Sequence, residues 1–335
     1  MTKDIGQIMP AEFGPHEQTI MCWPARAEIW GTHWREAEVA YAEVANTIAS
    51  FESVTMVVDP KHAERAGALC EAGVTISAIP IDDSWSRDSG PIYVHEGGSR
   101  LGLDFIFNGW GQKFSPFSQD AEFASRYLVH SKEPMKSVPM VLEGGSITVD
   151  GAGTLATTMQ CLLHPNRNPH LSMKQIEAVL REELGASSVV WLPHGLALDD
   201  DTDGHVDNVA AFTAPGHLLL QGCSDENEDD YMRMAINEKV ATSAIGGNGD
   251  ALAVDVIPVL PFTETENGRV VVPYLNFYVG NNFVLIPVCG NEADDDMVQM
   301  IGSFFTGRTM VPLHVGRILA IGGGGIHCIT QQVPV

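Results

Sequence analysis

The stretch THWREAEVAYAEVANTIASFESVTMVV, residues 32–58, shows how this chain is built. From Trp34 to Phe51 its apolar residues recur at helical spacing, behind Thr32 as a helix N-cap. The run then changes to Val54-Thr-Met-Val-Val58, a short apolar segment typical of a buried strand. The stretch therefore predicts a helix followed by a strand, the repeating unit of an α/β protein.

The same alternation returns several times. Helical patterns lie near residues 61–71, 118–129, 171–184, 228–243 and 293–305. Short strands rich in valine and isoleucine separate them, running from Val74 to Pro80, Val189 to Pro193, Val254 to Pro261 and Met310 to Pro312. The pattern predicts an α/β fold and suits both a doubly wound parallel sheet and a closed ring of strand-helix units. Because no linker-like stretch interrupts residues 1–335, we expect a single domain.

Composition narrows the class of protein and its partners. The chain has 335 residues, 44% of them hydrophobic, which is enough for a well-buried core. Its 43 acidic and 19 basic residues give a formal net charge of −24. This charge disfavours nucleic acid and anionic lipid and favours a cationic small molecule, although an acidic surface that serves solubility is the alternative.

Targeting and nucleotide-binding signals are missing from the sequence. There is no apolar run of membrane-spanning length, and Met1–Gln7 lacks the basic-then-apolar order of a signal peptide. We therefore expect a cytoplasmic protein. We expect no nucleotide, because no G-x-G-x-x-G motif follows a first strand and the late glycine run lacks the Lys-Ser/Thr of a phosphate loop.

One cysteine stands in an unusual setting. The six cysteines are widely spaced without a C-x-x-C pair, which indicates free thiols rather than a disulfide framework or a cysteine-zinc cluster. Cys328 follows a glycine run that lets backbone approach it closely, in Gly322-Gly-Gly-Gly-Ile-His-Cys-Ile-Thr-Gln-Gln332. We interpret Cys328 as the nucleophile, with inert packing as the alternative.

A carboxylate and an indole offer a place for a flat cation. The segment Asp82-Asp-Ser-Trp-Ser-Arg-Asp-Ser-Gly-Pro91 follows a predicted strand, where α/β folds place ligand groups. A carboxylate such as Asp88 can accept two parallel hydrogen bonds from a guanidinium, and Trp85 offers a face for the cation or its alkyl tail. Alternatively, Asp88 pairs with Arg87 or caps a turn.

His205 and Asp207 form a second candidate cluster in Gly204-His-Val-Asp-Asn208. If this segment is a strand, the two side chains share a face and one ligand could touch both. A histidine can protonate a leaving amine and then deprotonate water. Glu143, in Leu142-Glu-Gly-Gly145, could orient the ring of His205. The alternatives are a core histidine and a plain turn.

An acidic run allows a rival function. Asp199-Asp-Asp-Thr-Asp-Gly204 matches the opening of a calcium loop, with acids at positions one, three and five and glycine at six. The closing glutamate is missing, because position twelve is Ala210. A calcium-binding or non-catalytic protein is therefore a rival hypothesis to an enzyme with a thiol nucleophile.

Taken together, the motifs resemble those of the agmatine deiminase family, which is related to bacterial peptidyl-arginine deiminases. They run in one order from residue 9 to residue 332. The motifs are Met9-Pro-Ala-Glu-Phe-Gly-Pro-His-Glu, Trp85-Ser-Arg-Asp-Ser-Gly-Pro, Phe107-Asn-Gly-Trp-Gly, Leu142-Glu-Gly-Gly-Ser, Asn166-Arg-Asn-Pro, Asp199-Asp-Asp-Thr-Asp-Gly-His-Val-Asp-Asn and Gly-Gly-Ile-His-Cys-Ile-Thr-Gln-Gln.

The resemblance implies a pentein fold, a five-bladed ββαβ-type α/β propeller with pseudo-fivefold symmetry and a central site. It also implies catalysis without a metal or cofactor. By the same resemblance, Cys328 is the nucleophile, His205 the acid and base, and Glu143 the partner that orients the histidine. Asp88 and Asp207 clamp the guanidinium, and we assign Trp85, Asp201 and Asp203 to the rest of the substrate pocket.

The expected reaction is hydrolysis of agmatine to N-carbamoylputrescine and ammonia through a covalent amidino-cysteine. We expect the substrate cation, or an imidazolium at His205, to lower the pKa of the Cys328 thiol. The alternatives are peptidyl-arginine or another guanidine as substrate, and an amidinotransferase that passes the amidino group to an amine. The expected partner is a cationic guanidino small molecule, with no nucleic acid and no membrane; a homo-oligomer stays open.

Overall fold

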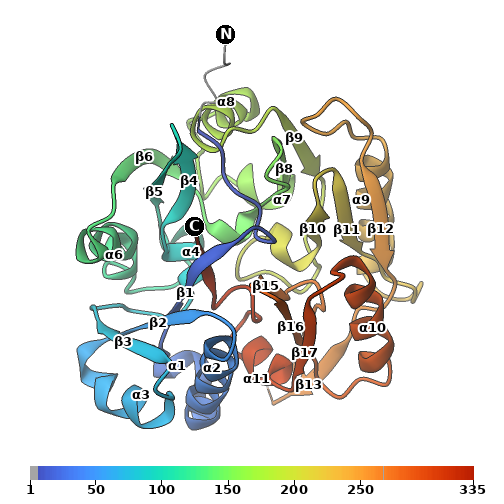
Figure 1. Cartoon of the computed structure of the whole chain (residues 1–335). Coiled ribbons are helices and arrows are strands. Elements are labelled where there is room, and N and C mark those ends of the chain that lie inside the picture. The colour runs from blue at the N-terminus through green and yellow to red at the C-terminus, as the bar shows by residue number, and fades with distance from the viewer. Residues whose placement is uncertain (1–6, 267) are drawn as a thin grey trace.

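Five small sheets stand in a ring around a common centre (Figure 1). The computed structural model describes residues 7–266 and 268–335. Residues 1–6, which make up most of the segment searched for a signal peptide, lie outside the described residues. Among the described helices, none is both long and apolar enough to cross a membrane.

Because the sheets stand in a ring, the chain adopts the closed α/β arrangement and not a doubly wound sheet.

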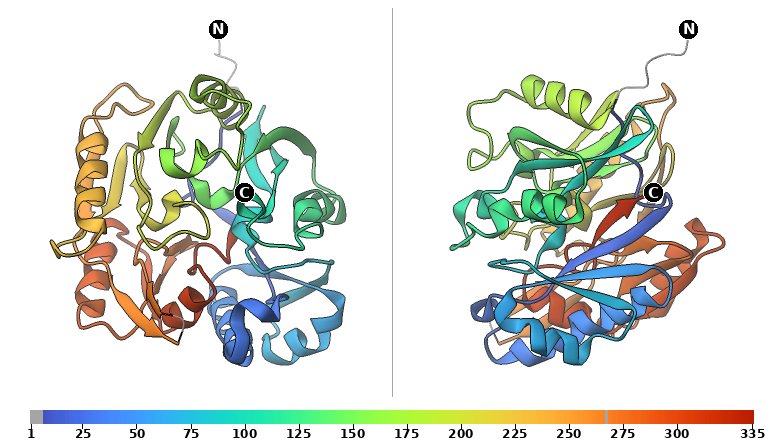
Figure 2. Two further views of the ribbon diagram at one scale, coloured as in Figure 1. Left: turned by 180° about the vertical axis from the view of Figure 1, so that it is seen from behind. Right: turned by 60° about the vertical axis from the view of Figure 1, so that its left-hand side comes forward.

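Each sheet is built on one plan. An inner strand pairs antiparallel with the next strand, and that strand pairs in parallel with a third after a helical crossover. Four of the sheets have three strands. The crossover helices lie toward the outer rim of the ring, as the views from the front and from behind agree (Figures 1 and 2).

The first sheet combines both ends of the chain. Its strands, in spatial order, are β18 (Gln331–Pro334), β1 (His16–Cys22), β2 (Ser53–Val58) and β3 (Val74–Ala78). Its helical segments are α1 (Ala27–Trp30), η1 (Gly31–His33), α2 (Trp34–Ala49), η2 (Pro60–His62) and α3 (Ala63–Leu69).

The second and third sheets follow along the chain. The second has β4 (Ile92–Glu96), β5 (Ser99–Ile106) and β6 (Met135–Val141), with α4 (Ser86–Ser89), α5 (Gly109–Gln112), η3 (Asp120–Glu122) and α6 (Phe123–Ser131). The third has β7 (Ile147–Val149), β8 (Thr154–Thr158) and β9 (Ser188–Leu192), with η4 (Gly144–Ser146), α7 (Met159–Leu162) and α8 (Met173–Leu184).

The last two sheets and a hairpin complete the ring. The fourth sheet has β10 (Ala210–Ala214), β11 (His217–Gln221) and β12 (Ala253–Ile257), with η5 (Val206–Asn208) and α9 (Asp230–Thr242). A separate hairpin joins β13 (Phe262–Thr265) to β14 (Gly268–Val271). The fifth sheet has β15 (Tyr278–Gly280), β16 (Phe283–Pro287) and β17 (Thr309–Leu313), with α10 (Asp294–Phe304) and α11 (Gly316–Ile321).

The helix and strand predicted from residues 32–58 are confirmed as α2 and β2. Ala37, Tyr41, Val44 and Ile48 lie on one buried face of α2, in the same hydrophobic cluster as Met56 of β2. This helical spacing of apolar residues buries one stripe against the sheet, which is why the pattern was visible in the sequence. The other predicted helices and strands also correspond to elements of the ring, within a few residues of their expected ends, except near 118–129, where the helix begins at Phe123.

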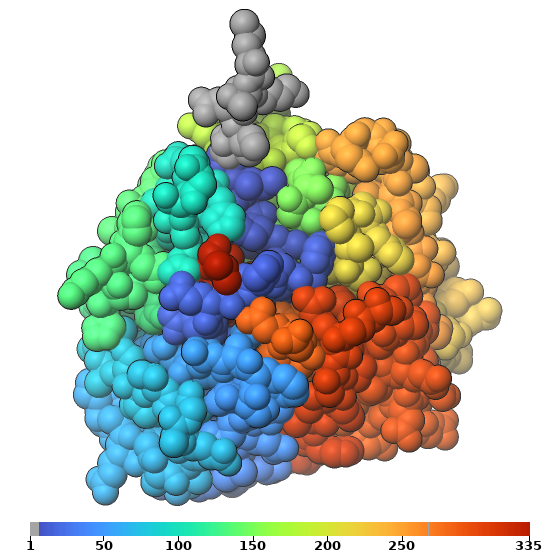
Figure 3. All heavy atoms as spheres, viewed as in Figure 1, coloured from blue at the N-terminus to red at the C-terminus, as the bar shows by residue number. Residues whose placement is uncertain are grey.

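The ring is closed by the last strand. β18 pairs antiparallel with β1, placing Gln331 opposite Ile20, while β1 pairs in parallel with β2. The N-terminal segment crosses the centre of one face, and the C-terminal end lies beside it (Figure 3). The closing strand begins three residues after Cys328, so ring closure also fixes the position of that thiol.

Candidate active site

The candidate residues come from segments that lead into the inner strand of each sheet. Asp88 lies on α4 before β4, Glu143 precedes η4 and β7, and His205 and Asp207 lie at η5 before β10. Asn276 precedes β15, and Cys328 precedes β18. Because the inner strands surround the centre, these five segments carry their side chains toward one region of the molecule.

A glycine shows how closely three of these side chains converge. A Cβ atom on Gly145 would lie 2.7 Å from His205 Nδ1, 2.8 Å from Asp88 Oδ1 and 2.9 Å from Asp207 Oδ2. All three are buried. The sequence-predicted clamp and the predicted acid-base histidine are therefore brought together, and the site has room for them only because residue 145 lacks a side chain.

Cys328 lies against Asp207 and Asn276. Its Sγ is 3.6 Å from Asp207 Oδ2 and accepts a hydrogen bond from Asn276 Nδ2 at 3.2 Å. The glycine run packs closely as predicted, because a Cβ on Gly324 would lie 2.4 Å from the Trp85 ring. Burial raises the pKa of the Cys328 thiol well above its ordinary value, and the Asp207 and Asp88 carboxylates raise it further. With these neighbours alone the thiol is protonated.

Asp88 is held by the protein and does not pair with Arg87. Its Oδ1 accepts from Gly145 N and its Oδ2 from Trp110 Nε1, both at 2.9 Å. Burial raises the pKa of Asp88, an effect that the His205 charge only partly offsets. Arg87 instead forms an ion pair with Glu12 at 3.0 Å.

His205 is a buried histidine with no hydrogen bond to either ring nitrogen from any described residue. Its Nδ1 lies 3.8 Å from Asp88 Oδ1. Burial lowers the pKa of His205, but Asp88, Cys161 and Glu143 together outweigh it and raise the pKa well above its ordinary value. Potential ligand atoms of Glu143, Cys161 and His205 lie within 4.8 Å of one another, which makes these residues the candidate metal-binding group among the described side chains.

Glu143 is anchored by an arginine from the Asn166-Arg-Asn-Pro motif. Arg167 Nε donates to Glu143 Oε1 at 2.6 Å, and both side chains are fully buried. Arg167 Nη1 also donates to Asp203 Oδ2 at 2.7 Å. Glu143 Oε2 has no hydrogen-bond partner in the described part of the chain. This oxygen is therefore the one available to accept a hydrogen bond from the His205 ring.

The strand considered for residues 204–208 does not form, because Val206–Asn208 is the 3-10 helix η5 with His205 at its N-cap. Gly204 has a φ of +86°, which turns the chain, and Asp199 Oδ2 accepts from His205 N and from Asn208 Nδ2, both at 3.0 Å. The turn still brings both side chains to the centre.

The acidic run does not form the calcium loop considered above. The Asp199 carboxylate binds the run's own backbone and Asn208, while that of Asp203 pairs with Lys113 and Arg167. Ala210, at the position of the closing ligand, begins β10. The two carboxylates have separate partners and so do not converge on one ion.

A small pocket, open to solvent, lies beside Cys328 and Asp88. Trp85 lines it and stacks on Trp30, with ring centroids 6.1 Å apart. Asp201, an exposed residue, lies among the lining residues, whereas Asp203 does not. The lining consists of Ile29, Trp85, Asp88, Trp110, Phe114, Asp201, Thr202, Gly322, Gly323 and Cys328. The carboxylate of Asp203, assigned to the substrate pocket from the sequence, instead holds the 199–204 loop to Lys113 and Arg167.

Four residues of the site were given no role from the sequence: Trp110, Arg167, Asn276 and His327. Trp110, Arg167 and His327 stand inside recognised motifs, which was a usable signal. Asn276 stands in none of those motifs. Only its place just before an inner strand, equivalent to that of Asp88 before β4, could have pointed to it.

Comparison with known proteins identifies the family. The family model of the Porphyromonas-type peptidyl-arginine deiminase matches residues 8–334. An agmatine deiminase from Stutzerimonas stutzeri is 40% identical, covering 98% of this chain and 96% of the relative. The chain belongs to the Porphyromonas-type peptidyl-arginine deiminase family. Its agmatine deiminase branch is the one that the motifs resembled.

Solved structures of this deiminase family agree with the fold. An agmatine deiminase of Enterococcus faecalis superposes with a TM-score of 0.93 at 30% identity, covering 98% of this chain and 96% of that one. A C. jejuni agmatine deiminase with a cysteine-to-serine substitution and substrate bound gives a TM-score of 0.89 at 26% identity, covering 97% and 96%. The predicted pentein fold is confirmed.

Proposed function

We propose that this protein hydrolyses agmatine to N-carbamoylputrescine and ammonia. The observation that carries the proposal is the convergence of the Cys328 thiol, the His205 imidazole and two carboxylates, Asp88 and Asp207, beside a cavity. A thiol and two acids suit a flat cation, because the acids pin the guanidinium while sulfur attacks its carbon.

Substrate binding prepares the nucleophile. The carboxylates of Asp88 and Asp207 raise the pKa of the Cys328 thiol, and a bound guanidinium neutralises their charge. The pKa then falls, the thiol releases its proton to solvent, and the thiolate forms beside the carbon that it attacks. The activation expected from the sequence thus needs the substrate, because the protein alone shifts the thiol in the opposite direction.

The first half of the reaction forms a covalent intermediate. Attack by sulfur on the guanidinium carbon gives a tetrahedral adduct. His205, held as an imidazolium by its acidic neighbours, donates a proton to the departing amine, and the carbon-nitrogen bond breaks to release ammonia. An amidino-thioether remains on Cys328. Glu143 orients the ring from its free oxygen.

The second half reverses these roles. The neutral His205 accepts a proton from water as the water oxygen attacks the amidino carbon. Collapse of this second adduct breaks the carbon-sulfur bond, returns the thiolate and leaves a ureido group on the substrate. Each turnover consumes one water and releases one ammonia.

The lining of the cavity favours agmatine over arginine. Its charged residues are the acids Asp88 and Asp201, and none of the ten lining residues named above is basic. The primary amine of agmatine would meet Asp201 at the exposed end, whereas the carboxylate of arginine would meet like charge there. Trp85 gives the alkyl chain an apolar wall.

Ammonia release tests the proposal. We expect agmatine to give ammonia and a ureido product far faster than arginine, peptidyl-arginine or a shorter guanidino acid. The Cys328→Ala variant should release none. A new guanidine formed on an added amine would instead indicate an amidinotransferase, and preferred turnover of peptidyl-arginine would reject the substrate assignment. A single catalytic domain over residues 1–335, a cytoplasmic location and homo-oligomerisation stay predictions.

A further inference from the structure

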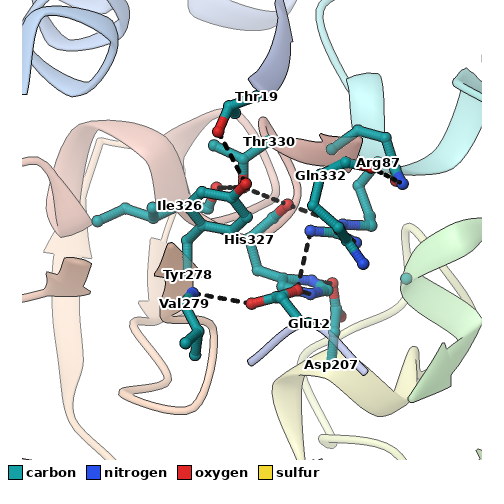
Figure 4. A network of polar contacts seen from close by, with 12 residues as sticks. Glu12, Thr19, Arg87, Asp207, Tyr278, Val279, Ile326, His327, Thr330 and Gln332 are labelled. Atoms are coloured by element: carbon teal, nitrogen blue, oxygen red, sulfur yellow. Dashed lines mark hydrogen bonds and ion pairs between the residues drawn. The ribbon is translucent and has the colours of Figure 1, made fainter. Parts of the chain in front are cut away.

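His327 precedes Cys328 in the chain, and its ring lies between two carboxylates (Figure 4). Nδ1 is 2.9 Å from Asp207 Oδ2 and Nε2 is 2.8 Å from Glu12 Oε2. An ionised carboxylate only accepts hydrogen bonds, so a ring that bonds to two of them must carry a hydrogen on both nitrogens. The geometry therefore requires an imidazolium at His327.

Glu12 is anchored from two other directions. Its Oε2 accepts from Arg87 Nη2 at 3.0 Å and its Oε1 accepts from Val279 N at 2.8 Å. Burial raises the pKa of Glu12, but His327 and Arg87 outweigh it and lower the pKa to about 2. Glu12 therefore stays ionised and binds the His327 imidazole at Nε2.

At its other nitrogen, Nδ1, the His327 imidazole binds one oxygen of the Asp207 carboxylate. Asp207 Oδ2 is taken by His327, whereas Oδ1 is buried and has no hydrogen-bond partner among the described residues. Burial raises the pKa of Asp207, yet His327, His205 and Arg87 together outweigh this effect and lower it, in contrast to the raised pKa of Asp88. The two acids of the clamp thus differ in their contacts: Asp207 is hydrogen-bonded to this imidazolium, whereas Asp88 is hydrogen-bonded to Gly145 N and Trp110 Nε1.

We propose that His327 is a positioning residue: its doubly protonated ring, held by Glu12, fixes Asp207 Oδ2 so that Oδ1 is directed to the guanidinium, and loss of the second ring proton sets the alkaline limit of activity. This inference rests on the proposed deiminase function.

Charged groups from several elements act on His327. Glu12 in the N-terminal segment and Asp207 at η5 favour its charge, whereas Arg87 on α4 opposes it. Beyond them, Tyr278 of β15 and Arg308 before β17 lie near enough for Glu12 to affect their pKa values. Burial lowers the pKa of His327, but the carboxylates raise it overall. The ring is charged below this raised pKa and loses its proton as pH rises through it, which releases Asp207.

The Glu12→Gln variant tests the proposal without touching the cavity. Removing one carboxylate should move the alkaline limb of kcat/KM for agmatine to lower pH by about one unit. At pH values above the shifted limb, kcat/KM should be roughly tenfold lower than in the wild type, mainly because KM rises. His327→Gln, which cannot carry charge, should lower kcat/KM at every pH. An unshifted limb in Glu12→Gln would overturn the proposal.

A matched control is available in the same molecule. Glu52 pairs with His16 at 3.3 Å, and both side chains are buried; His16 Nε2 bonds to the backbone oxygen of Glu12, not to its carboxylate, and the pair does not contact Asp207. Glu52→Gln should lower the melting temperature and leave the alkaline limb in place. A shift equal to that of Glu12→Gln would mean that general destabilisation, not the charge of His327, moves the limb.

Nitrogen NMR of the wild-type ring gives an answer that depends neither on turnover nor on variant folding. An ordinary histidine is neutral at about pH 8, so a doubly protonated His327 ring there supports the proposal. A neutral ring there overturns it. If wild-type protein released no ammonia from agmatine, the proposed function would fail, while the NMR result would still decide the charge of His327.

Discussion

At the scale of single residues, the site holds several buried carboxylates close to a thiol, and most have a dedicated cation. Glu143 has Arg167, Glu12 has Arg87, and Asp207 has His327. Asp88 is held by neutral donors, Trp110 and Gly145, and by the more distant His205. Of these four carboxylates, Asp88 is therefore the one without a hydrogen-bonded cation.

This difference predicts the acid limb of the pH profile. Burial raises the pKa of Asp88 above 3.8, so the carboxylate protonates at a higher pH than an ordinary aspartate. Because a protonated carboxyl cannot pair with a guanidinium, kcat/KM for agmatine should fall as pH drops through this raised pKa. Initial rates at subsaturating agmatine measure the limb. Activity that stays undiminished down to the titration range of an ordinary aspartate would contradict the role of Asp88.

Asp201 should determine specificity at the far end of the cavity. We expect Asp201→Asn to raise KM for agmatine by roughly tenfold with little change in kcat, because it removes a charge that meets the amine. The KM for a guanidine with an uncharged tail, such as butylguanidine, should not change. The neighbouring Asp200→Asn is the control, since Asp200 is exposed and does not line the cavity. Equal losses with both guanidines would remove Asp201 from amine recognition.

At the scale of elements, the sequence indicated the helices and strands far better than the turns that carry the chemistry. The stripe of α2 is visible because its packing is local and periodic. The turn at η5 is set by Asp199 and by positive φ at Asp203 and Gly204, which a periodic pattern does not reveal. The strand considered there does not form for this reason.

Gly145 tests whether the site tolerates any extra atom. Gly145→Ala places a Cβ within 3 Å of His205, Asp88 and Asp207, so these groups must separate. Displacement on this scale should reduce kcat/KM by about 100-fold or more. Gly67→Ala is the control, because Gly67 lies on α3 with open space around it, and should leave activity unchanged with a slightly higher melting temperature. Full activity of Gly145→Ala would show that the predicted crowding is absent.

At the scale of the whole molecule, the ring brings together residues that are far apart in the chain. Asp88, Glu143, His205 and Cys328 could be chosen from their motifs, but pattern alone left a doubly wound sheet and a ring equally open. Asn276 and the link from Glu12 to His327 were not predicted, since both depend on contacts between residues far apart in sequence. The closed ring could be predicted from the family resemblance, and not from the periodicity of apolar residues.

Closure of the ring by β18 should contribute measurably to stability. Val333 is fully buried among residues of the first and second sheets, including Ile20 and Tyr93. Val333→Ala should lower the free energy of unfolding by about 2 kcal/mol, from lost burial and the cavity left behind. Val335→Ala, at an exposed position, should change it little. Equal denaturation midpoints for the two variants would contradict the closing role of β18.

The most direct test of the central claim is mass spectrometry of peptides from enzyme quenched with acid during turnover of agmatine. The account predicts that the peptide containing Cys328 gains the mass of agmatine less ammonia, and that the addition disappears once substrate is exhausted. An addition on another cysteine, or rapid turnover with no addition on Cys328, would contradict it.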